Sequence, residues 1–548
     1  MPARPTSNRL ALNPLSVAVL VASWIALFAN WPLWRALAVL PEMASLRGAL
    51  FIAGFGVMVA AVTTALLALF AWRWTLKPVA ALLLIAAAFG AHFMGTYGVV
   101  IDPTMMVNVL QTNVGETRDL LSLRLLVSVL LLAGLPLLWL WRVPLHSKRF
   151  LPQLGRNAAA IVAALVLAAL VLVASFAELA STMRNHKALR YLINPLNSVW
   201  ALAVVGLEGG ARPKGPPQPI GLDARVLPRP GGTKPPLLMF VIGETARADH
   251  FALNGYARPT NPELATLPVL SFGNVSACGT NTAASLPCMF SHRGKKGFDA
   301  RKHDDENLLD LLQRAGLAVL WIDNQAGCKG VCERVPQTMA DNPPPADKRL
   351  CSDGECLDEV MLQGLDRRLD ALPQARRGQG VVLVLHQMGS HGPAYYKRSP
   401  PTRKPFQPEC TTNVLQQCER QALINAYDNS IAYTDHVLAQ SIGWLTQQAD
   451  RYDTALLYVS DHGESLGENN LYLHGLPYAL APREQTHVPM LLWLAPGAAR
   501  SLQPACLQAQ RSAAWSHDNL FHSVLGLIGV TASEYQPALD VLAACRAH

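Results

Sequence analysis

The chain has 548 residues, of which 51% are hydrophobic and 15% are charged. Ordinary soluble domains carry about 25% charged residues, so this composition excludes a wholly soluble enzyme, a disordered chain and a coiled coil. The net charge of +8 does not indicate nucleic-acid binding, because the basic residues are scattered and form no stripe.

The N-terminal third is predicted to be a five-helix transmembrane domain over residues 1–178. Of the 38 acidic residues, 33 lie after residue 200. Uncharged stretches are long enough to cross a bilayer, which takes about 20 helical residues: Leu10–Trp34, Gly48–Trp72, Pro78–Ile101, Leu125–Trp141 and Asn157–Ala177. The bias of Lys and Arg in the short loops puts the N-terminus in the cytoplasm, and an odd number of spans puts everything after residue 178 outside.

Residues 179–236 are predicted to connect two domains. Leu179–Val205 is mixed apolar and basic, as in segments that lie along a membrane surface. Residues 211–236 are rich in Pro and Gly, which disfavours a helix or a central strand and indicates a semi-rigid linker.

Residues 237–548 are predicted to form an α/β domain with a largely parallel sheet. Unbroken apolar runs are typical of strands covered on both faces, and they occur at 237–243, 318–323, 381–386, 454–460 and 488–494. Helical patterns such as Glu306–Ala315 and Cys356–Leu372 lie between them. Ligands in such folds bind beyond the carboxyl ends of the strands.

All ten cysteines lie in this region, between Cys278 and Cys545. An even number in an exported domain indicates disulfides. The alternative is a zinc–thiolate site, but the spacing of Cys328 and Cys332 has no second pair to complete it. The spacings group the cysteines as Cys278–Cys288, Cys328–Cys332, Cys351–Cys356 and Cys410–Cys418, which leaves Cys506–Cys545.

Residues of the types that bind zinc follow several of these strands. Glu244 follows the first run, and Asp461 and His462 follow the fourth. His391 and His474 lie in short glycine-containing segments further on. Carboxylates and neutral imidazoles are good zinc ligands, and a catalytic site keeps one position open. Neighbouring residues on a straight strand point to opposite faces, so a turn at Gly463 is needed for Asp461 and His462 to meet one ion.

A candidate nucleophile lies in the segment 277–283, which contains Thr280 and Thr282. Gly279 permits a tight turn, and a hydroxyl at the start of the following helix lies in a field that favours an alkoxide and an incoming phosphate. Zinc coordination also lowers the pKa of a hydroxyl. The alternative is that both threonines only cap the helix.

Several motifs together resemble those of the lipid A phosphoethanolamine transferases, a family that includes the mobile colistin-resistance enzymes and belongs to the alkaline phosphatase/sulfatase superfamily. The motifs are residues 243–247 (GETAR), 278–280 (CGT), 327–330 (GCKG), 389–393 (GSHGP), 460–465 (SDHGES) and 472–475 (YLHG). The resemblance covers nearly the whole chain. It implies an inner-membrane enzyme with a periplasmic catalytic domain, phosphatidylethanolamine as donor and lipid A as acceptor. We expect a monomer.

The resemblance also implies roles for individual residues. Thr280 would be the nucleophile, and the main zinc ion would be held by Glu244, Thr280, Asp461 and His462. His391 and His474 would meet the transferred phosphate or a second zinc ion, with Lys329 near the phosphate. Spacing places Asn108, Thr112 and Glu116 on one helical face, and the resemblance assigns this face to the ethanolamine headgroup.

Other polar residues are given lesser roles. His517, Asp518 and His522 are predicted to lie on a packed helix near the sheet and not to bind the metal. Asp323 and Asn324 follow a strand and are candidates for a layer of residues around the metal ligands.

Alternative functions are weighed against this one. Cys278 is followed by Gly and Thr instead of the Pro and Arg of a sulfatase, which argues against sulfatase activity. A glycerol-phosphate transferase resembling lipoteichoic acid synthases, or a phosphoethanolamine transferase acting on core sugars or glucans, stays open. A transporter is disfavoured because the spans carry no charged residue. Transfer to lipid A would lower the negative charge of the outer membrane and give polymyxin resistance.

Overall fold

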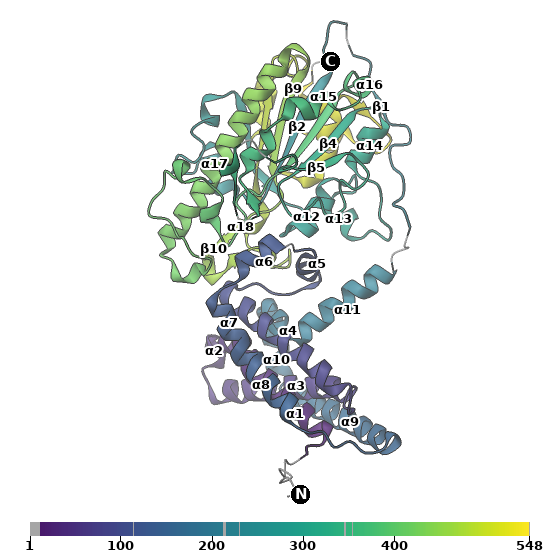
Figure 1. Cartoon of the computed structure of the whole chain (residues 1–548), viewed down its shortest axis with the longest axis vertical. Coiled ribbons are helices and arrows are strands. Elements are labelled where there is room, and N and C mark those ends of the chain that lie inside the picture. Colours follow the sequence, from purple (N-terminus) through teal and green to yellow (C-terminus); the bar gives the residue numbers. More distant parts are fainter. Residues whose placement is uncertain are drawn as a thin grey trace, which may run out of the picture. The chain divides into compact units, whose positions relative to one another are not determined.

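The computed structural model describes residues 11–112, 114–211, 215–229, 231–344, 347–352 and 354–546 (Figure 1). The chain forms two compact units. The membrane unit comprises Met1–Met106 and Leu121–Gly206, and the sheet unit comprises Val107–Leu120 and Leu207–His548. The division after Gly206 falls inside the predicted connecting region 179–236, and a short segment between two spans belongs to the sheet unit.

Among the residues that the structure describes, the membrane unit contains four to five helices that could span a bilayer, where the sequence predicts five. Four helical stretches are long and apolar enough to cross a bilayer, namely α3 (Leu46–Ala68), α4 (Leu76–Tyr97), Leu123–Arg142 and α9 (Phe150–Ala174). A pair of helices, Pro14–Ala29 and Trp31–Ala38, is bent by 48° and makes the fifth span when the two are counted as one. Pro32 lies in the first turn of the second helix, where it lacks a donor and ends the preceding helix.

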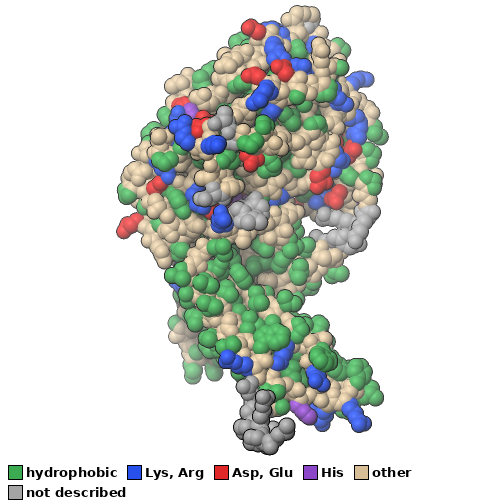
Figure 2. All heavy atoms as spheres, viewed as in Figure 1, with side chains coloured by type: hydrophobic (Ala, Val, Ile, Leu, Met, Phe, Trp, Pro, Cys, Tyr) green, Lys and Arg blue, Asp and Glu red, His purple; other side chains and the backbone are tan. Residues whose placement is uncertain are grey.

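The surface of the membrane unit suits a lipid environment. Small side chains such as Ala18, Ala22 and Ala87 fill the contacts between its helices, which lets the backbones approach closely. Large apolar side chains point outward, for example Leu170, which is 63% exposed. On the face shown in Figure 2, hydrophobic side chains cover most of this unit.

The segment after the last span differs from the prediction. Its helices are α10 (Phe176–Asn185), a 3-10 turn (Lys187–Leu192) and α11 (Leu196–Ala211). The Pro/Gly-rich stretch is not a free linker throughout, because β1 (Arg225–Val226) pairs with β14 (Val530–Thr531). Ile220 is also buried in the hydrophobic core of the sheet unit.

The sheet unit is built on an eight-stranded sheet, which confirms the predicted α/β fold with a largely parallel sheet. The strand order is β13-β3-β12-β9-β2-β8-β4-β5, and β12 alone runs antiparallel to its neighbours. The strands, in that order, are Trp515–Ser516, Val269–Ser276, His487–Leu494, Asp453–Ser460, Pro236–Gly243, Val381–His386, Ala318–Asp323 and Gln337–Met339.

Helices cover both faces of this sheet. Leu238, Phe240 and Ile242 of β2 pack with α14 (Leu308–Arg314) and α20 (Leu520–Ile528) in one hydrophobic core. The alternate residues of β2 are equally buried, and α17 (Arg420–Gln447) packs on β9. Figure 1 shows α17 and α14 on either side of the sheet. Burial on both faces explains the unbroken apolar runs of the central strands.

The remaining elements are short. They are α5 (Pro103–Gln111), α6 (Val114–Leu120), α12 (Thr282–Met289), α13 (Gly294–Asp299), α15 (Leu365–Asp370), α16 (Gln374–Arg377), α18 (Arg483–Thr486), α19 (Pro504–Gln510), β6 (Cys351–Ser352), β7 (Glu355–Cys356), β10 (Ser465–Leu466) and β11 (Tyr472–Leu473). The helix predicted over Cys356–Leu372 is broken. A 3-10 turn (Asp358–Leu362) is separated from α15 by Gly364, whose φ of 69° ends a right-handed helix.

All ten cysteines form disulfides in the five predicted pairs. Four pairs close loops of ten residues or fewer, and the fifth ties Cys545, near the C-terminus, to α19. No cysteine is left as a ligand for a thiolate zinc site.

Candidate metal and phosphate site

The register of three adjacent strands brings the predicted ligands together. Gly243, the last residue of β2, lies opposite Ser460, the last residue of β9, and Ile242 lies opposite His386 of β8. The residues that follow, Glu244 and Asp461, therefore leave the same edge of the sheet side by side. This is the edge at which ligands bind in open α/β sheets.

Glu244, Asp461 and His462 form a fully buried group that could hold a metal ion. His462 Nε2 lies 3.3 Å from Glu244 Oε1 and 3.4 Å from Asp461 Oδ2. The turn that aligns Asp461 and His462 requires Gly463, since a Cβ atom there would lie 2.1 Å from the carbonyl oxygen of Glu484.

The electrostatics of this group call for a cation. Burial opposes the charge on His462, but the carboxylates of Asp461 and Glu244 outweigh it and raise the pKa to about 10. Burial and the neighbouring Glu244 raise the pKa of Asp461 to about 6. Without a metal ion, the only positive charge among the three side chains would be that of protonated His462, against two buried carboxylates. A divalent ion would balance both carboxylates and leave His462 neutral.

A second group shares Glu244 with His391 and His474. The imidazole rings of His391 and His474 are 5.8 Å apart, and those of His462 and His474 are 4.4 Å apart. Burial lowers the pKa of His391 to about 3, which keeps the imidazole neutral, the form that binds metal ions. Five of the residues predicted to bind the metal or the phosphate therefore lie close together: Glu244, His391, Asp461, His462 and His474.

Unpaired buried atoms support a bound cation. Glu244 Oε1, Asp461 Oδ2 and His391 Nδ1 are buried and have no hydrogen-bond partner. Buried polar atoms without partners are rare in folded proteins and cost about 1–3 kcal/mol each. Two carboxylates and two or three imidazoles form a donor set that suits zinc.

The hydroxyl at this site belongs to Thr282 and not to Thr280, contrary to the prediction. Thr282 Oγ1 donates to Glu244 Oε2 at 3.0 Å and lies 3.4 Å from His462 Nε2. Thr280 Oγ1 instead donates to the carbonyl oxygen of Leu476 at 2.6 Å. The reason is local, because Asn281 is the N-cap of α12 and puts Thr282 at the first helical position.

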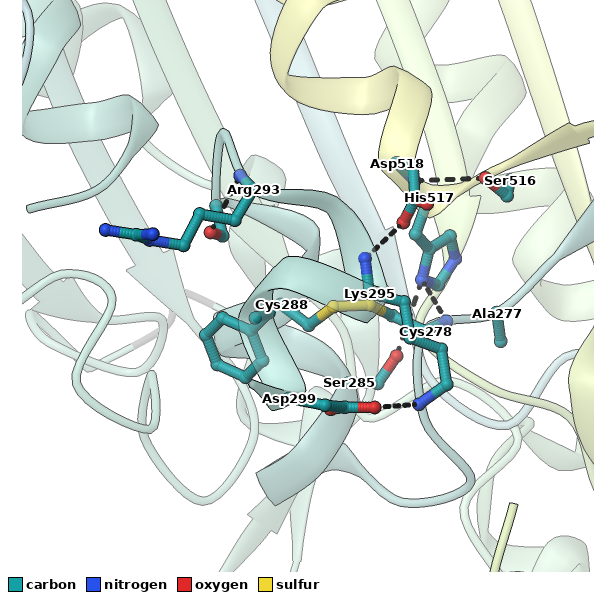
Figure 3. The surroundings of a disulfide bond; sticks show 12 residues. Ala277, Cys278, Ser285, Cys288, Arg293, Lys295, Asp299, Ser516, His517 and Asp518 are labelled. Carbon is teal, nitrogen blue, oxygen red and sulfur yellow. Dashed lines mark hydrogen bonds and ion pairs between the residues drawn. A yellow bond between two sulfur atoms is a disulfide. The ribbon is translucent and has the colours of Figure 1, made fainter. Parts of the chain in front are cut away.

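The turn that carries Thr282 is fixed from two sides (Figure 3). The Cys278–Cys288 disulfide joins the turn to the end of α12. His517 Nδ1 accepts a hydrogen bond from the backbone N–H of Cys278 at 3.0 Å, and its Nε2 donates to the carbonyl oxygen of Ser460 at 3.0 Å. His517 thus connects the turn to the end of β9.

Further residues around the ligands were not singled out from the sequence. Gln325 Nε2 donates to Glu244 Oε2 at 2.9 Å. His386 Nδ1 lies 3.1 Å from Asp323 Oδ2, and burial of Asp323 is outweighed by the charge of His386, which lowers the Asp323 pKa to about 2. The candidate Asp323 thus lies behind His386. Position after a strand was a signal for Asp323, whereas nothing in the sequence marked Gln325.

Asn324, the other candidate for this outer layer, supports the loop of His391. Its Nδ2 donates to Asp358 Oδ1, which also accepts the backbone N–H of Met388. Asp518 accepts the backbone N–H of Lys295, and His522 Nδ1 accepts that of Gln536, so both lie in structural contacts as predicted.

The predicted donor-binding residues do not lie on one continuous helix, because Thr112 falls between α5 and α6. Asn108 is in α5, which ends at Gln111, and a new helix, α6, starts at Val114. Thr112 Oγ1 donates to the carbonyl oxygen of Asn108. Threonine side chains that bond to the backbone in this way can bend or weaken a helix. The side chain of Glu116 lies outside the described residues.

A cavity of about 400 Å³ adjoins this segment and the start of α12. Val107 and Gln111 of α5, Ala283 of α12 and Lys329 are among the residues that line it. Lys329 Nζ donates to the carbonyl oxygens of Ala326 at 3.2 Å and Gln111 at 3.4 Å. The cavity therefore joins α5 to the start of α12, and the predicted Lys329 lines its wall.

Comparison with known proteins gives matches over the whole length. Residues 59–207 match the family model for phosphoethanolamine transferase EptA/EptB, and residues 236–530 match the sulfatase model. The chain is 39% identical to phosphoethanolamine transferase EptA of Salmonella typhimurium, over 98% of both chains, and 41% identical to phosphatidylethanolamine transferase Mcr-1 of Escherichia coli, over 84% and 85%. A solved integral membrane lipooligosaccharide phosphoethanolamine transferase A from Neisseria meningitidis is 32% identical, with a TM-score of 0.90 over 97% of this chain and 99% of that one.

Proposed function

This chain belongs to the phosphoethanolamine transferase family, and from that premise we propose that it moves phosphoethanolamine from phosphatidylethanolamine to a phosphate of lipid A through Thr282. The enzyme is a multi-pass protein of the bacterial inner membrane with a periplasmic catalytic domain. The acceptor class is supported by the solved relative that is named a lipooligosaccharide phosphoethanolamine transferase.

The observation that carries this proposal is the position of the Thr282 hydroxyl. It lies at the N-terminus of α12 and contacts both Glu244 and His462. A phosphorus atom approaching this oxygen would meet the helix N-terminus, whose free N–H groups favour phosphate oxygens. Thr280 offers no such position because its hydroxyl is used by the carbonyl of Leu476.

Zinc is the metal that suits these residues, and its ligands would be Glu244, Asp461, His462 and the Thr282 oxygen. When bound, zinc lowers the pKa of a coordinated hydroxyl and offsets the charge of a phosphate. His391 and His474 are placed to contact the oxygens of the phosphate or to hold a second ion.

The transfer takes two displacements at phosphorus. In the first, Thr282 Oγ forms a bond to phosphorus, the bond to the diacylglycerol oxygen breaks, and diacylglycerol leaves with a proton. In the second, a phosphate oxygen of lipid A attacks the same phosphorus, and the bond to Thr282 Oγ breaks. The threonine regains its proton, and lipid A carries the phosphoethanolamine group.

The product explains a resistance phenotype. The added ethanolamine ammonium offsets one negative charge at the lipid A phosphate. Cationic peptides such as polymyxins and colistin are attracted to that surface by charge, so their binding weakens. Cells that express the chain are expected to tolerate more polymyxin than cells that do not.

The test is mass spectrometry of lipid A from cells that express matched variants. Thr282→Val and Thr280→Val each replace a hydroxyl by a methyl group of the same shape, two residues apart. We expect one added phosphoethanolamine with the wild type and with Thr280→Val, and none with Thr282→Val. Membrane immunoblots and thermal unfolding in detergent establish that each variant is folded.

Two results would contradict the proposal. Loss of the adduct with Thr280→Val but not with Thr282→Val would make Thr280 the nucleophile. A folded, zinc-loaded wild type that leaves lipid A unmodified would exclude it as the acceptor, and analysis of core sugars and glucans from the same cells would then identify the acceptor.

A further inference from the structure

Arg398 has a buried guanidinium group that joins three separate parts of the sheet unit. Its side chain is 4% exposed. Nη2 donates to Asp119 Oδ2 at 2.6 Å, Nη1 donates to Glu355 Oε2 at 2.9 Å, and Nε donates to the backbone carbonyl oxygen of His391 at 2.9 Å. One side chain thus links α6, the β6–β7 hairpin and the loop of His391.

The Asp119 end of this link is as well fixed as the arginine. The Asp119 side chain is 2% exposed, and Lys397 Nζ contacts its second oxygen. Asn413 Nδ2 donates to the backbone carbonyl of Asp119 at 2.6 Å. Both the side chain and the backbone near the end of α6 are therefore held by the loop of residues 395–413.

The segment that Asp119 anchors is the one assigned to the donor headgroup. Val107–Leu120 belongs to the sheet unit although spans precede and follow it in the sequence. It carries Asn108 and Thr112, and its Gln111 lines the same cavity as Ala283, the residue after Thr282 in α12. The helix break after Gln111 means that α5 and α6 do not hold each other as one rigid rod.

We propose that Arg398 and Asp119 position the donor-binding segment relative to His391, an assignment that rests on the proposed function for the roles of these elements. The pair does not touch the reacting atoms. It sets the distance between the wall that binds the headgroup and the imidazole that meets the phosphate. Its loss weakens donor binding more than it slows the chemical steps.

The first test is kinetic and uses the full chain in proteoliposomes. The vesicles contain lipid A, with phosphatidylethanolamine at varied mole fraction and phosphatidylglycerol as the remainder. Asp119→Asn is expected to raise the apparent KM for phosphatidylethanolamine about tenfold, the loss expected for one charged hydrogen bond, with kcat within about threefold. Glu355→Gln removes the negative charge of another partner of the Arg398 guanidinium but leaves the bond between Arg398 and Asp119 of α6 in place. This variant should leave KM within about twofold of the wild type.

A second measurement does not depend on activity. Hydrogen exchange read by mass spectrometry should become faster across residues 107–120 in Asp119→Asn and stay unchanged there in Glu355→Gln. A double variant of Asp119→Asn with Arg398→Gln should raise KM by less than the product of the two single effects, because the two side chains share one of their links.

Other outcomes contradict the inference. Equal exchange at residues 107–120 in wild type and Asp119→Asn would show that the pair does not position the segment. Equal losses of thermal stability in the two single variants, without a change in KM, would reduce the cluster to a structural role. Absence of transfer by the wild type would contradict the proposed function instead, while the exchange data would still decide the positioning role.

Discussion

The imidazole of His517 lies between the backbone N–H of Cys278 and the backbone carbonyl of Ser460, at 3.0 Å from each. It thereby sets the turn that carries Thr282 against the strand end that carries Asp461. Burial lowers the pKa of His517 to about 3, so the ring is neutral at physiological pH and keeps one donor and one acceptor.

We expect His517→Ala to lower kcat by more than about tenfold, because two buried backbone groups lose their partner, at a cost of about 2–4 kcal/mol in total. His522→Ala is the matched control, since His522 is equally buried but bonds to Gln536 away from the site. Transfer to lipid A and the unfolding midpoint in detergent are measured for both. Equal kcat in the two variants would exclude a positioning role for His517.

Gly463→Ala should disrupt the metal site. The new Cβ would lie 2.1 Å from the carbonyl oxygen of Glu484, so the Asp461–His462 turn must move, at a cost of about 1–3 kcal/mol. Gly443→Ala is the control, because nothing lies within 4 Å of a Cβ at that position in α17. There the change should be neutral or stabilise by up to about 1 kcal/mol. Bound zinc and thermal unfolding report both effects, and full zinc occupancy in Gly463→Ala would be the contrary result.

Zinc content provides a direct test of the ligand set. Elemental analysis of the purified chain should give at least one zinc per molecule, and Glu244→Gln or Asp461→Asn should lower it several-fold. A chelator should lower the unfolding midpoint of the wild type, because an ion that binds the folded state stabilises it. The same chelator should leave the midpoint of Asp461→Asn unchanged. A shift of equal size in both would place the stabilising ion elsewhere.

The Cys278–Cys288 disulfide should affect stability and turnover together. Its loop of about ten residues corresponds to about 3 kcal/mol of stabilisation in the chain-entropy model. Replacing both cysteines by alanine should lower the unfolding midpoint and also kcat, since the loop contains Thr282. Alanine at Cys506 and Cys545 should lower the midpoint and leave kcat unchanged. The idea fails if the two double variants have the same kcat.

The raised pKa of Asp435 predicts that the stability of the protein depends on pH. Its carboxylate accepts the backbone N–H groups of Glu263 and Leu264, yet burial raises its pKa to about 7. Because the folded state binds the proton more tightly than the unfolded state, this contribution is complete below about pH 4 and is lost as pH rises through 7. The free energy of unfolding of wild type relative to Asp435→Asn should fall between about pH 4 and pH 7, by at most about 1.4 kcal/mol per pH unit. Parallel curves would contradict this pKa.

The sheet and most of the ligands were predictable from the sequence for a physical reason. Strands buried on both faces need unbroken apolar runs, so their ends were visible, and polar residues directly after those ends converge at one edge. Glu244, Asp461 and His462 were found in this way. By contrast, the 28 residues of α17 carry buried polar side chains such as Asp428 and Asn429, which obscure the apolar period of a helix.

The choice between two threonines could not be made from the sequence alone. Thr280 and Thr282 lie in one short motif, and either hydroxyl suits the chemistry. Which threonine reaches the metal ligands depends on Asn281. Its side chain accepts the backbone N–H of Ala284, so Asn281 is the N-cap and the helix starts at Thr282. In the same way, α5 ends at Gln111 although the spacing of Asn108, Thr112 and Glu116 is that of a continuous helix.

The membership of Val107–Leu120 in the sheet unit constrains how such chains can recombine. A crossover at the obvious junction near residue 207 would combine one parent's membrane helices and α6 with the other parent's sheet. Asp119 and Arg398 would then be inherited separately, from parents whose loops were matched to different partners. Hybrids with that junction should work when both parents carry this acid–base pair, and lose donor affinity when one of them does not.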